Sequence, residues 1–216
     1  GEDGSFFHGF PMLVTEERGA KMELLDSPYG PVAFLYGNDF SLITNSGSGQ
    51  VTGEVVFVGH GLCDPQREWD DYGDTDLTGK IALITRGTPD NGYDWDREGS
   101  RDSTLTEAAQ RGAVGILFSQ GPRPVHGGAI HDAGYRPDLP MAYVSHRIVN
   151  LLLMGTGYDA DSYGKALRDE PTPLATGKRL RLHTEVPRVA DGRARTVVGL
   201  VPGSGPALRE ELGLVG

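Results

Sequence analysis

Six histidines and one cysteine are the side chains of this sequence that could carry metal or nucleophilic chemistry. Among the histidines, only His126 and His131, which Asp132 follows, lie near one another. A transition metal needs ligands that converge at ~2.0–2.2 Å, and the Gly-rich connection around these residues could bring them together. The chain has no His-Glu-x-x-His or comparable spacing, so surface histidines on a flexible connection are the simpler interpretation. A self-contained metal-dependent hydrolase that uses His126, His131 and Asp132 is kept as an alternative.

The segment Gly59-His-Gly-Leu-Cys-Asp64 follows an apolar run and begins like a dinucleotide-binding fingerprint. Asp64 occupies the third glycine position, and an acidic segment follows it instead of a helix, so negative charge would repel a phosphate. Cys63 has His60 upstream but no third orienting group, and the chain has no Gly-x-Ser-x-Gly elbow. Cys63 is interpreted as a small packing residue near the end of a strand. We predict no catalytic residue, no cofactor-binding residue and no metal ligand in this chain.

Carboxylates are concentrated in two stretches. Asp70, Asp71, Asp74 and Asp76 could supply oxygen ligands to calcium, but the twelve-residue pattern and the terminal glutamate of an EF-hand are missing. A solvated turn, in which aspartates bond to nearby backbone, is the other interpretation. The remaining acidic stretch, residues 87–103, is expected to be an exposed loop, and exposed carboxylates make poor general acids.

Three large aromatic residues, Trp69, Tyr93 and Trp95, lie in these acidic stretches. Aromatic side chains supply much of the energy at recognition surfaces, so these three are candidates for binding a peptide or protein partner. The alternative is that they fold back over the core of their own domain.

Residues 76–118 must position these loops, because the rest of the chain is organised around them. The apolar runs at residues 81–84 and 113–118 are continuous, as is typical of strands buried on both faces. Between them, Thr104 and Glu107 have capping-box spacing, Leu105 and Ala108 offer an apolar face, and Gly112 stands where a helix would end. The pattern predicts a strand, a long loop, a short helix and a parallel strand at the centre of the fold.

The flanking patterns predict further elements. Strands are expected at residues 5–14, 20–25, 32–36, 53–59, 139–145, 178–186 and 195–201. A helix is expected at residues 147–154, with Ser145 as its cap. Residues 44–50 are rich in Gly and Ser and predict a flexible link, and residues 64–76 predict a surface loop with a helical turn.

Composition limits the classes of partner. Lys and Arg number 20 and Asp and Glu 30, so the net charge is −10 and nucleic acid is not expected as a partner. A single cysteine excludes an internal disulfide framework. No stretch reaches the ~18–20 apolar residues of a membrane span, and the first residues lack the features of a signal peptide. Because the sequence starts with Gly, we expect it to be a mature fragment or an excerpt.

The order of signals from residue 51 to residue 155 resembles the protease-associated (PA) domain. Four pieces carry the resemblance: Val51-Thr-Gly-Glu-Val-Val-Phe-Val-Gly-His-Gly-Leu62, Asp70-Asp-Tyr-Gly-Asp-Thr-Asp-Leu-Thr-Gly-Lys-Ile-Ala-Leu-Ile-Thr-Arg-Gly87, Ala108-Ala-Gln-Arg-Gly-Ala-Val-Gly-Ile-Leu-Phe118 and Leu139-Pro-Met-Ala-Tyr-Val-Ser145. His60 stands where many relatives have Tyr. The resemblance implies an α/β, β-rich fold: a small open barrel or sheet of mixed strands with short flanking helices.

The flanks, Gly1-Glu-Asp-Gly-Ser-Phe-Phe-His-Gly-Phe10 and Arg195-Thr-Val-Val-Gly-Leu-Val-Pro-Gly-Ser-Gly-Pro206, resemble strands of the catalytic domain of secreted zinc aminopeptidases that carry a PA insertion. In such enzymes the next motif would be Ala-His-x-Asp-His, which supplies the first zinc ligand. The resemblance implies N-terminal strands at 1–44, of which 1–14 belong to the peptidase sheet. It further implies a PA domain at 45–160 and return strands at 161–216 that lead into a catalytic domain absent from this chain.

The function expected from this resemblance is a non-catalytic PA module of a zinc aminopeptidase-like protein. Such a module would shape substrate access or bind peptide or protein partners, and its own peptidase catalytic domain would be a further partner. Zinc is expected in the missing catalytic domain and no cofactor in this chain. The resemblance also implies a secreted, periplasmic or cell-surface location, and an adhesive module of a cell-surface protein remains an alternative.

Overall fold

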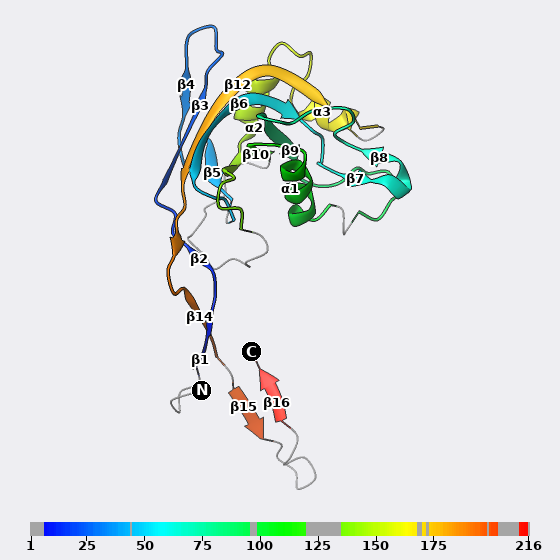
Figure 1. Cartoon of the computed structure of the whole chain (residues 1–216). Coiled ribbons are helices and arrows are strands. Elements are labelled where there is room, and N and C mark those ends of the chain that lie inside the picture. Colours follow the sequence, from blue (N-terminus) through cyan, green and yellow to red (C-terminus); the bar gives the residue numbers. More distant parts are fainter. Residues whose placement is uncertain are drawn as a thin grey trace.

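The computed structural model describes residues 7–43, 45–95, 99–119, 135–167, 170–171, 173–197, 199–202 and 212–215. Its largest element is an eight-stranded mixed sheet (Figure 1). In spatial order its strands are β4 (Val32–Phe34), β3 (Gly19–Leu24), β12 (Leu174–Glu185), β6 (Gly49–Phe57), β9 (Ile81–Thr85), β10 (Gly115–Ser119), β11 (Met141–Val144) and β5 (Phe40–Leu42). The predicted mixed, strand-rich α/β class is confirmed.

The two edge strands of this sheet, β4 and β5, are neighbours in the sequence. Tyr36 forms an isolated bridge with Phe40 across the turn between them. The same turn is held by Asp39, whose carboxylate accepts the backbone N–H of Leu35 at 2.9 Å. The sheet is curled so that its edge strands, β4 and β5, come close to each other at this turn. This is the open-barrel form that the resemblance implied.

The central unit has the predicted order of strand, loop, helix and parallel strand. Strand β9 pairs in parallel with β10, and the crossover between them contains helix α1 (Arg101–Gln110). Both strands are buried on both faces, as their continuous apolar runs predicted. Gly112 follows the helix with a φ of 89°, a left-handed conformation that suits glycine at a helix end.

The predicted cap of this helix was wrong. The helix begins one turn earlier than the Thr104–Glu107 spacing suggested, and Ser100 is its N-cap. The Ser100 hydroxyl accepts the backbone N–H of Ser103 at 3.3 Å. Thr104 lies inside the helix, where its hydroxyl donates back to the carbonyl of Arg101 at 3.0 Å.

Helices cover both faces of the sheet. On one face, Leu105 and Ala108 of α1 pack against a cluster that includes Ala82, Ile84 and Phe118. On the other face, α2 (His146–Leu153) and α3 (Ala160–Ala166) pack against a second cluster, to which β9 contributes Ile81 and Leu83. Consecutive residues of β9 thus serve opposite cores, as expected for strand geometry.

Helix α2 confirms the element predicted at residues 147–154, although its cap differs from the expectation. Ser145 occupies the N-cap position, but its hydroxyl makes no capping hydrogen bond. Its backbone carbonyl instead accepts the N–H groups of Ile148 and Val149. Helix α3, which the sequence patterns did not predict, has a complete capping box between Asp159 and Ser162.

The flexible link predicted at residues 44–50 was wrong for the part that the structure describes. Ser46 accepts the backbone N–H of Met141 at 2.9 Å, and the carbonyl of Gly47 accepts the Thr184 hydroxyl at 2.7 Å. A Cβ atom at Gly47 would lie 2.1 Å from the carbonyl oxygen of Arg136. Small residues are therefore present here because backbones approach closely.

The predicted surface loop at residues 64–76 is partly buried. The expected helical turn exists as a short 3₁₀ helix, η1 (Pro65–Arg67), between β7 (Cys63–Asp64) and β8 (Trp69–Asp70). Trp69, Asp71 and Tyr72 are buried, however. Trp69 packs in a cluster with Leu62 and Trp95, and Tyr72 packs in the cluster that contains Leu105 and Ala108 of α1.

A two-stranded arm leaves the sheet at the point where β3 begins and β12 ends (Figure 1). It contains β2 (Val14–Thr15) paired with β13 (Arg188–Val189), followed by β1 (Phe7–Pro11) paired with β14 (Arg193–Val197). A further antiparallel pair, β15 (Gly199–Pro202) with β16 (Leu212–Val215), follows β14. No helix among the described residues is long and apolar enough to cross a membrane.

The large sheet takes strands from all three predicted segments: β3, β4 and β5 from 1–44, β12 from 161–216, and the rest from 45–160. The division into those segments stays a prediction. The two flanks pair with each other, since residues 7–11 lie antiparallel to residues 193–197.

Candidate functional site

A cleft of about 480 Å³ lies where the parallel strands of the sheet end. Strands β6, β9, β10 and β11 are neighbours and run in parallel, so their carboxyl ends share one edge. The cleft is lined by residues at or just after these ends and by the first turn of α1: His60, Thr85, Arg86, Gly87, Gly99, Ser100, Arg101, Asp102, Thr104, Phe118 and Tyr143. Sheets with parallel strands commonly bind ligands at this edge, and the volume suits a small molecule or one or two residues of a peptide.

Two buried aromatic residues form part of the lining. The rings of Phe118 and Tyr143 meet edge to face, with centroids 6.3 Å apart. The Tyr143 hydroxyl accepts a hydrogen bond from Nη1 of Arg101 at 3.1 Å. The cleft therefore combines an apolar surface with the guanidinium of Arg101, whose position is fixed by the Tyr143 hydroxyl.

The N-terminus of α1 faces this cleft, because the crossover helix starts at the edge where β9 ends. A helix N-terminus carries a partial positive charge and N–H groups without partners inside the helix. Ser100 satisfies the N–H of Ser103, but in the described part of the chain the N–H groups of Arg101 and Asp102 have no acceptor. The formal charges of the lining are two guanidiniums, Arg86 and Arg101, against one carboxylate, Asp102, in a protein whose net charge is −10.

His60 contributes a buried imidazole to the wall of the cleft. The residue is only 8% exposed, and its Nδ1 has no hydrogen-bond partner. Burial lowers the pKa of His60, although hydrogen bonds to the carbonyls of Thr85 and Gly87 partly oppose this effect. The imidazole is therefore neutral near pH 7, and its buried Nδ1 is left without a partner.

The loop that carries His60 is held by an internal carboxylate. Gly59 and Gly61 have φ values of 55° and 72°, and in this turn the N–H groups of His60 and Leu62 converge on one acceptor. One oxygen of Asp71 accepts the N–H of His60 at 3.0 Å and that of Leu62 at 2.9 Å. Its other oxygen accepts the indole N–H of Trp69 at 2.9 Å. The glycine pattern that resembled a phosphate loop thus forms an anion-binding turn that the chain fills with its own aspartate.

Asp71 is nearly inaccessible to solvent, and burial raises its pKa to about 6, although its three hydrogen bonds oppose that rise. Aspartates bonded to nearby backbone were expected in this stretch, and Asp70 and Asp76 also follow that pattern by accepting the N–H groups of Tyr72 and Thr78. The expected solvation was wrong for Asp71, because its carboxylate is buried against the His60 loop and the Trp69 indole.

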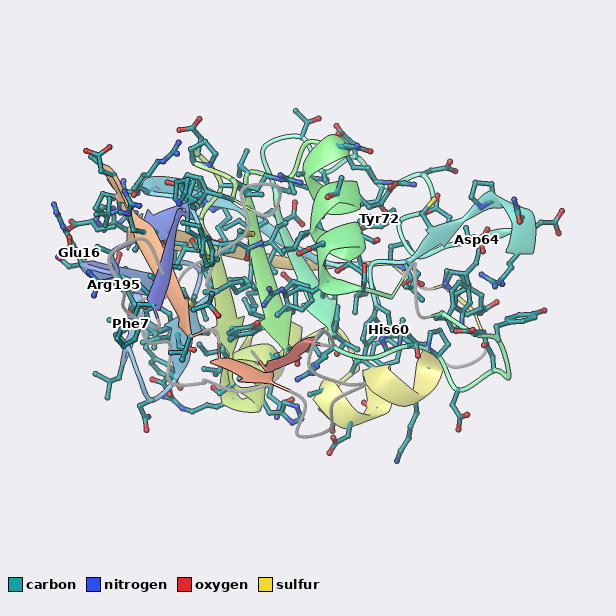
Figure 2. All side chains as sticks on the ribbon, turned by 90° about the horizontal axis from the view of Figure 1, so that it is seen from below. Phe7, Glu16, His60, Asp64, Tyr72 and Arg195 are labelled. Atoms are coloured by element: carbon teal, nitrogen blue, oxygen red, sulfur yellow. The ribbon has the colours of Figure 1, made fainter. Side chains whose placement is uncertain are left out.

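Tyr72 and Arg111 link the His60 loop to α1. The Tyr72 hydroxyl lies 3.3 Å from the carbonyl of Gly61 and 3.4 Å from that of Thr104. Arg111 stacks on the Tyr72 ring, 4.4 Å from its centroid, and pairs with Asp70 and Glu107 at 3.1 and 2.8 Å. In Figure 2, Tyr72 and His60 lie on the same side of α1. The helix start and the His60 loop are therefore held as one unit.

The three aromatic candidates for partner binding lie in different environments. Trp69 and Trp95 are buried and meet edge to face with centroids 5.5 Å apart, and Arg67 lies 5.0 Å from the Trp95 ring. Both indoles therefore fold back over their own domain. Tyr93 is 56% exposed and stands against Trp95. A role in binding stays a prediction, and among these three only Tyr93 offers a substantial exposed surface.

Cys63 lines a second cleft, together with Asp64, Arg67, Glu107 and neighbouring residues, and not the cleft that His60 lines. Burial raises the pKa of the Cys63 thiol, and the nearby carboxylates of Asp70 and Glu107 raise it further. A protonated thiol is a poor nucleophile, so this environment suits the packing role expected from the sequence.

The candidate metal ligands His126, His131 and Asp132 lie outside the described residues, and the metal-dependent alternative stays a prediction. Within the described ranges, no group of three or more His, Cys, Asp or Glu side chains could hold a metal ion. The donor set on the described part of the chain therefore does not fit a zinc centre.

No protein-family model matches the sequence, and no curated protein matches it either. The structure is similar to an aminopeptidase from Aneurinibacillus sp. strain AM-1, with a TM-score of 0.53 and 18% identity over 93% of this chain and 39% of that one. It is also similar to a peptidase M28 precursor from Shewanella amazonensis SB2B, with a TM-score of 0.51 and 18% identity over 92% of this chain and 41% of that one. The chain thus spans about two fifths of the length of these proteins, and the likeness is one of fold.

Proposed function

We propose that this chain is a non-catalytic, PA-type module of a zinc aminopeptidase-like protein, which shapes substrate access to the catalytic domain or binds peptide or protein partners. The zinc chemistry would belong to a catalytic domain outside this chain. On the same resemblance we propose a secreted, periplasmic or cell-surface location. The observation that carries the proposal is the two-stranded arm, seen beside the similarity of fold to parts of two peptidases.

The arm has the form of a connection to a host domain. The entering segment, β1 to β3, and the returning segment, β12 to β14, run antiparallel beside each other from the sheet to the tip of the arm (Figure 1). A Cβ atom at Gly192 would lie 2.6 Å from the carbonyl of Met12, so the two segments approach closely. A domain inserted into another chain must enter and leave at adjacent points, and this arm provides them.

The arm also exposes apolar side chains. Phe7 and Val197 face each other across β1 and β14, and each is 53% exposed. Phe10 projects from the opposite face of the same ribbon and is also exposed. A two-stranded ribbon is marginally stable alone in water, so a neighbouring sheet that covers these side chains would stabilise it.

The residues encoded after Gly216 provide the first test. We expect an Ala-His-x-Asp-His zinc-ligand motif there and, before Gly1, a secretion signal. An open reading frame that lacks any zinc-ligand motif would overturn the assignment to an aminopeptidase-like protein.

The purified chain provides the second test. With zinc present, we expect no release of chromophore from aminoacyl p-nitroanilides above that of a blank. Zinc-dependent turnover that disappears in His131→Ala would instead establish the metal-dependent alternative and refute a non-catalytic module.

The arm can be tested with the catalytic domain expressed as a separate chain. Replacing Phe7 and Val197 by Ser should weaken its association with this chain, while the thermal midpoint of this chain alone stays nearly constant. Tyr29→Ser, which changes an aromatic residue that is 98% exposed, is the matched control and should leave association intact. Equal weakening by both changes would argue against docking through the arm.

A further inference from the structure

The first turn of α1 carries a basic residue at its first position, where acidic residues are favoured. Arg101 adds a positive charge to the positive end of the helix dipole, and it is not paired with a carboxylate among the described residues. Its guanidinium donates a hydrogen bond to the Tyr143 hydroxyl, which holds it at the cleft. The helix end and Arg101 therefore present two positive features to the same space.

A second, independent feature of the cleft is the buried imidazole of His60. The side chain is more than nine-tenths buried, yet Nδ1 has no partner in the structure. A buried polar atom without a hydrogen bond is costly, and such atoms are uncommon unless a ligand or water completes them. Since Nδ1 is the ring nitrogen without a partner, a neutral imidazole with its proton on Nε2 would present Nδ1 as an acceptor to an N–H that reaches it.

We infer that this cleft binds a carboxylate group of a peptide, with Arg101 and the N-terminal N–H groups of α1 as donors to the carboxylate and Phe118 and Tyr143 against the attached side chain. His60 Nδ1 would accept the amide N–H next to that carboxylate after a small rotation of its ring. This inference rests on the peptide-binding part of the proposed function. It does not depend on the assignment to an aminopeptidase-like protein, so the two proposals can fail separately.

A carboxylate fits this cleft better than a phosphate does. A guanidinium fork can pair with either anion, so the charge of the site decides: the lining has only one formal positive charge in excess once Asp102 is counted. A dianion would meet both Asp102 and the acidic surface of a chain with net charge −10. The buried aromatic pair can pack against the side chain of a peptide, whereas inorganic phosphate has no apolar group to pack against it.

The test is calorimetric titration of the 216-residue chain with short peptides that differ only at the carboxylate. Acetyl-Ala-Ala-Leu and acetyl-Ala-Ala-Phe are compared as free acids and as amides, and acetyl-Ala-Glu-Ala amide is added to separate a side-chain carboxylate from a terminal one. We expect at least one carboxylate-bearing peptide to bind, with an affinity about tenfold or more above that of the matched amide that has no carboxylate. Equal binding of acids and amides, or no binding at all, would overturn the inference.

Inorganic phosphate is titrated in the same way. Phosphate that binds as tightly as the best peptide would show that the cleft takes anions in general and would overturn the preference for a peptide carboxylate.

Variants then locate the site. Arg101→Gln should weaken binding of the acid peptide about tenfold or more, and Tyr143→Phe, which keeps the ring but releases Arg101, should weaken it less. Arg195→Gln removes the same charge from the exposed face of β14 and is the matched control. If Arg101→Gln unfolds, shifts of the backbone amide NMR signals of residues 101–103 on titration of the unaltered chain replace it. Binding that is indifferent to Arg101, or shifts confined to other regions, would refute this location.

Discussion

Asp71 makes the stability of this fold depend on pH in a direction opposite to that of most salt-bridged aspartates. Its pKa is raised from 3.8 to about 6 because its carboxylate is buried. The folded state therefore holds a proton that the unfolded state releases between these two values. Stability from this group is complete below about pH 4 and is lost as the pH rises through about 6. A shift of about two pKa units corresponds to about 3 kcal/mol.

Asp71→Asn separates this electrostatic cost from the hydrogen bonds. The amide oxygen can still accept the N–H groups of His60 and Leu62, but the amide nitrogen then faces the indole N–H of Trp69. That buried donor loses its acceptor at a cost of ~1–3 kcal/mol. At about pH 4 the substitution should therefore destabilise the fold by this amount. Near pH 7 it should be close to neutral, because the ~3 kcal/mol cost of a buried charge is removed at the same time.

The assay is urea unfolding followed by tryptophan fluorescence between about pH 4 and pH 7, with Asp74→Asn as the control. Asp74 is an exposed carboxylate three residues away, so its replacement should leave the pH profile of the wild type in place. The difference in unfolding free energy between wild type and Asp71→Asn should change by ~2–3 kcal/mol across this range. If the unfolding free energies of wild type and Asp71→Asn changed in parallel with pH, Asp71 would not titrate as a buried group and would not be the buried anchor of the His60 loop.

The packing of the site predicts three further results. Ala108→Leu should lower the free energy of unfolding by ~1–3 kcal/mol, because Ala108 is fully buried between α1 and the sheet; an unchanged Tm would contradict that packing. Trp95→Ala should cost ~3–5 kcal/mol by urea denaturation, because the residue is 2% exposed, whereas Tyr93→Ala should be nearly neutral; equal effects would place both rings at the surface. Gly61→Ala should destabilise the His60 loop, because the φ of Gly61 is 72° and a Cβ atom would lie 3.1 Å from the Tyr72 hydroxyl. The rate of amide hydrogen exchange in the loop should rise, and an unchanged rate would contradict this strain.

The sequence predicted the centre of the fold well because burial on both faces leaves a direct trace in composition. A strand between two layers needs apolar residues at every position, and the runs that became β9 and β10 have this property. The alternation that predicted β12 reflects burial on one face only: Leu180 and Leu182 are buried, while Arg179 and Arg181 pair with carboxylates of the neighbouring hairpin.

Short-range signals failed where the same residue types serve two purposes. Glycine and serine at residues 45–48 have the composition of a flexible link, but here they permit close backbone approach and supply side-chain hydrogen bonds. The helix cap was misplaced because Ser100 and Thr104 are both good caps, and only the loop that delivers Ser100 to the strand edge decides between them.

The cleft could not be predicted from the sequence because its residues are brought together by strand order. His60, Arg101 and Tyr143 are far apart in the chain, and each becomes a neighbour of the others only because β6, β9, β10 and β11 are adjacent and parallel. One local signal was available, namely an arginine in the first turn of a helix, where an acidic residue would be more stable.

The fold contains two backbone features that attract anions, and they differ in how they are filled. The turn between Gly59 and Gly61 is occupied by Asp71, whose carboxylate is buried and committed to three N–H groups. The start of α1 has only the neutral hydroxyl of Ser100 as its cap, and Arg101 adds positive charge beside it. The buried Asp71 carboxylate in the turn rigidifies the His60 loop, and this loop in turn supports the start of α1 through Tyr72. A helix end left open, reinforced by a clamped arginine and placed at an accessible cleft, is the arrangement expected when the carboxylate is to come from a ligand.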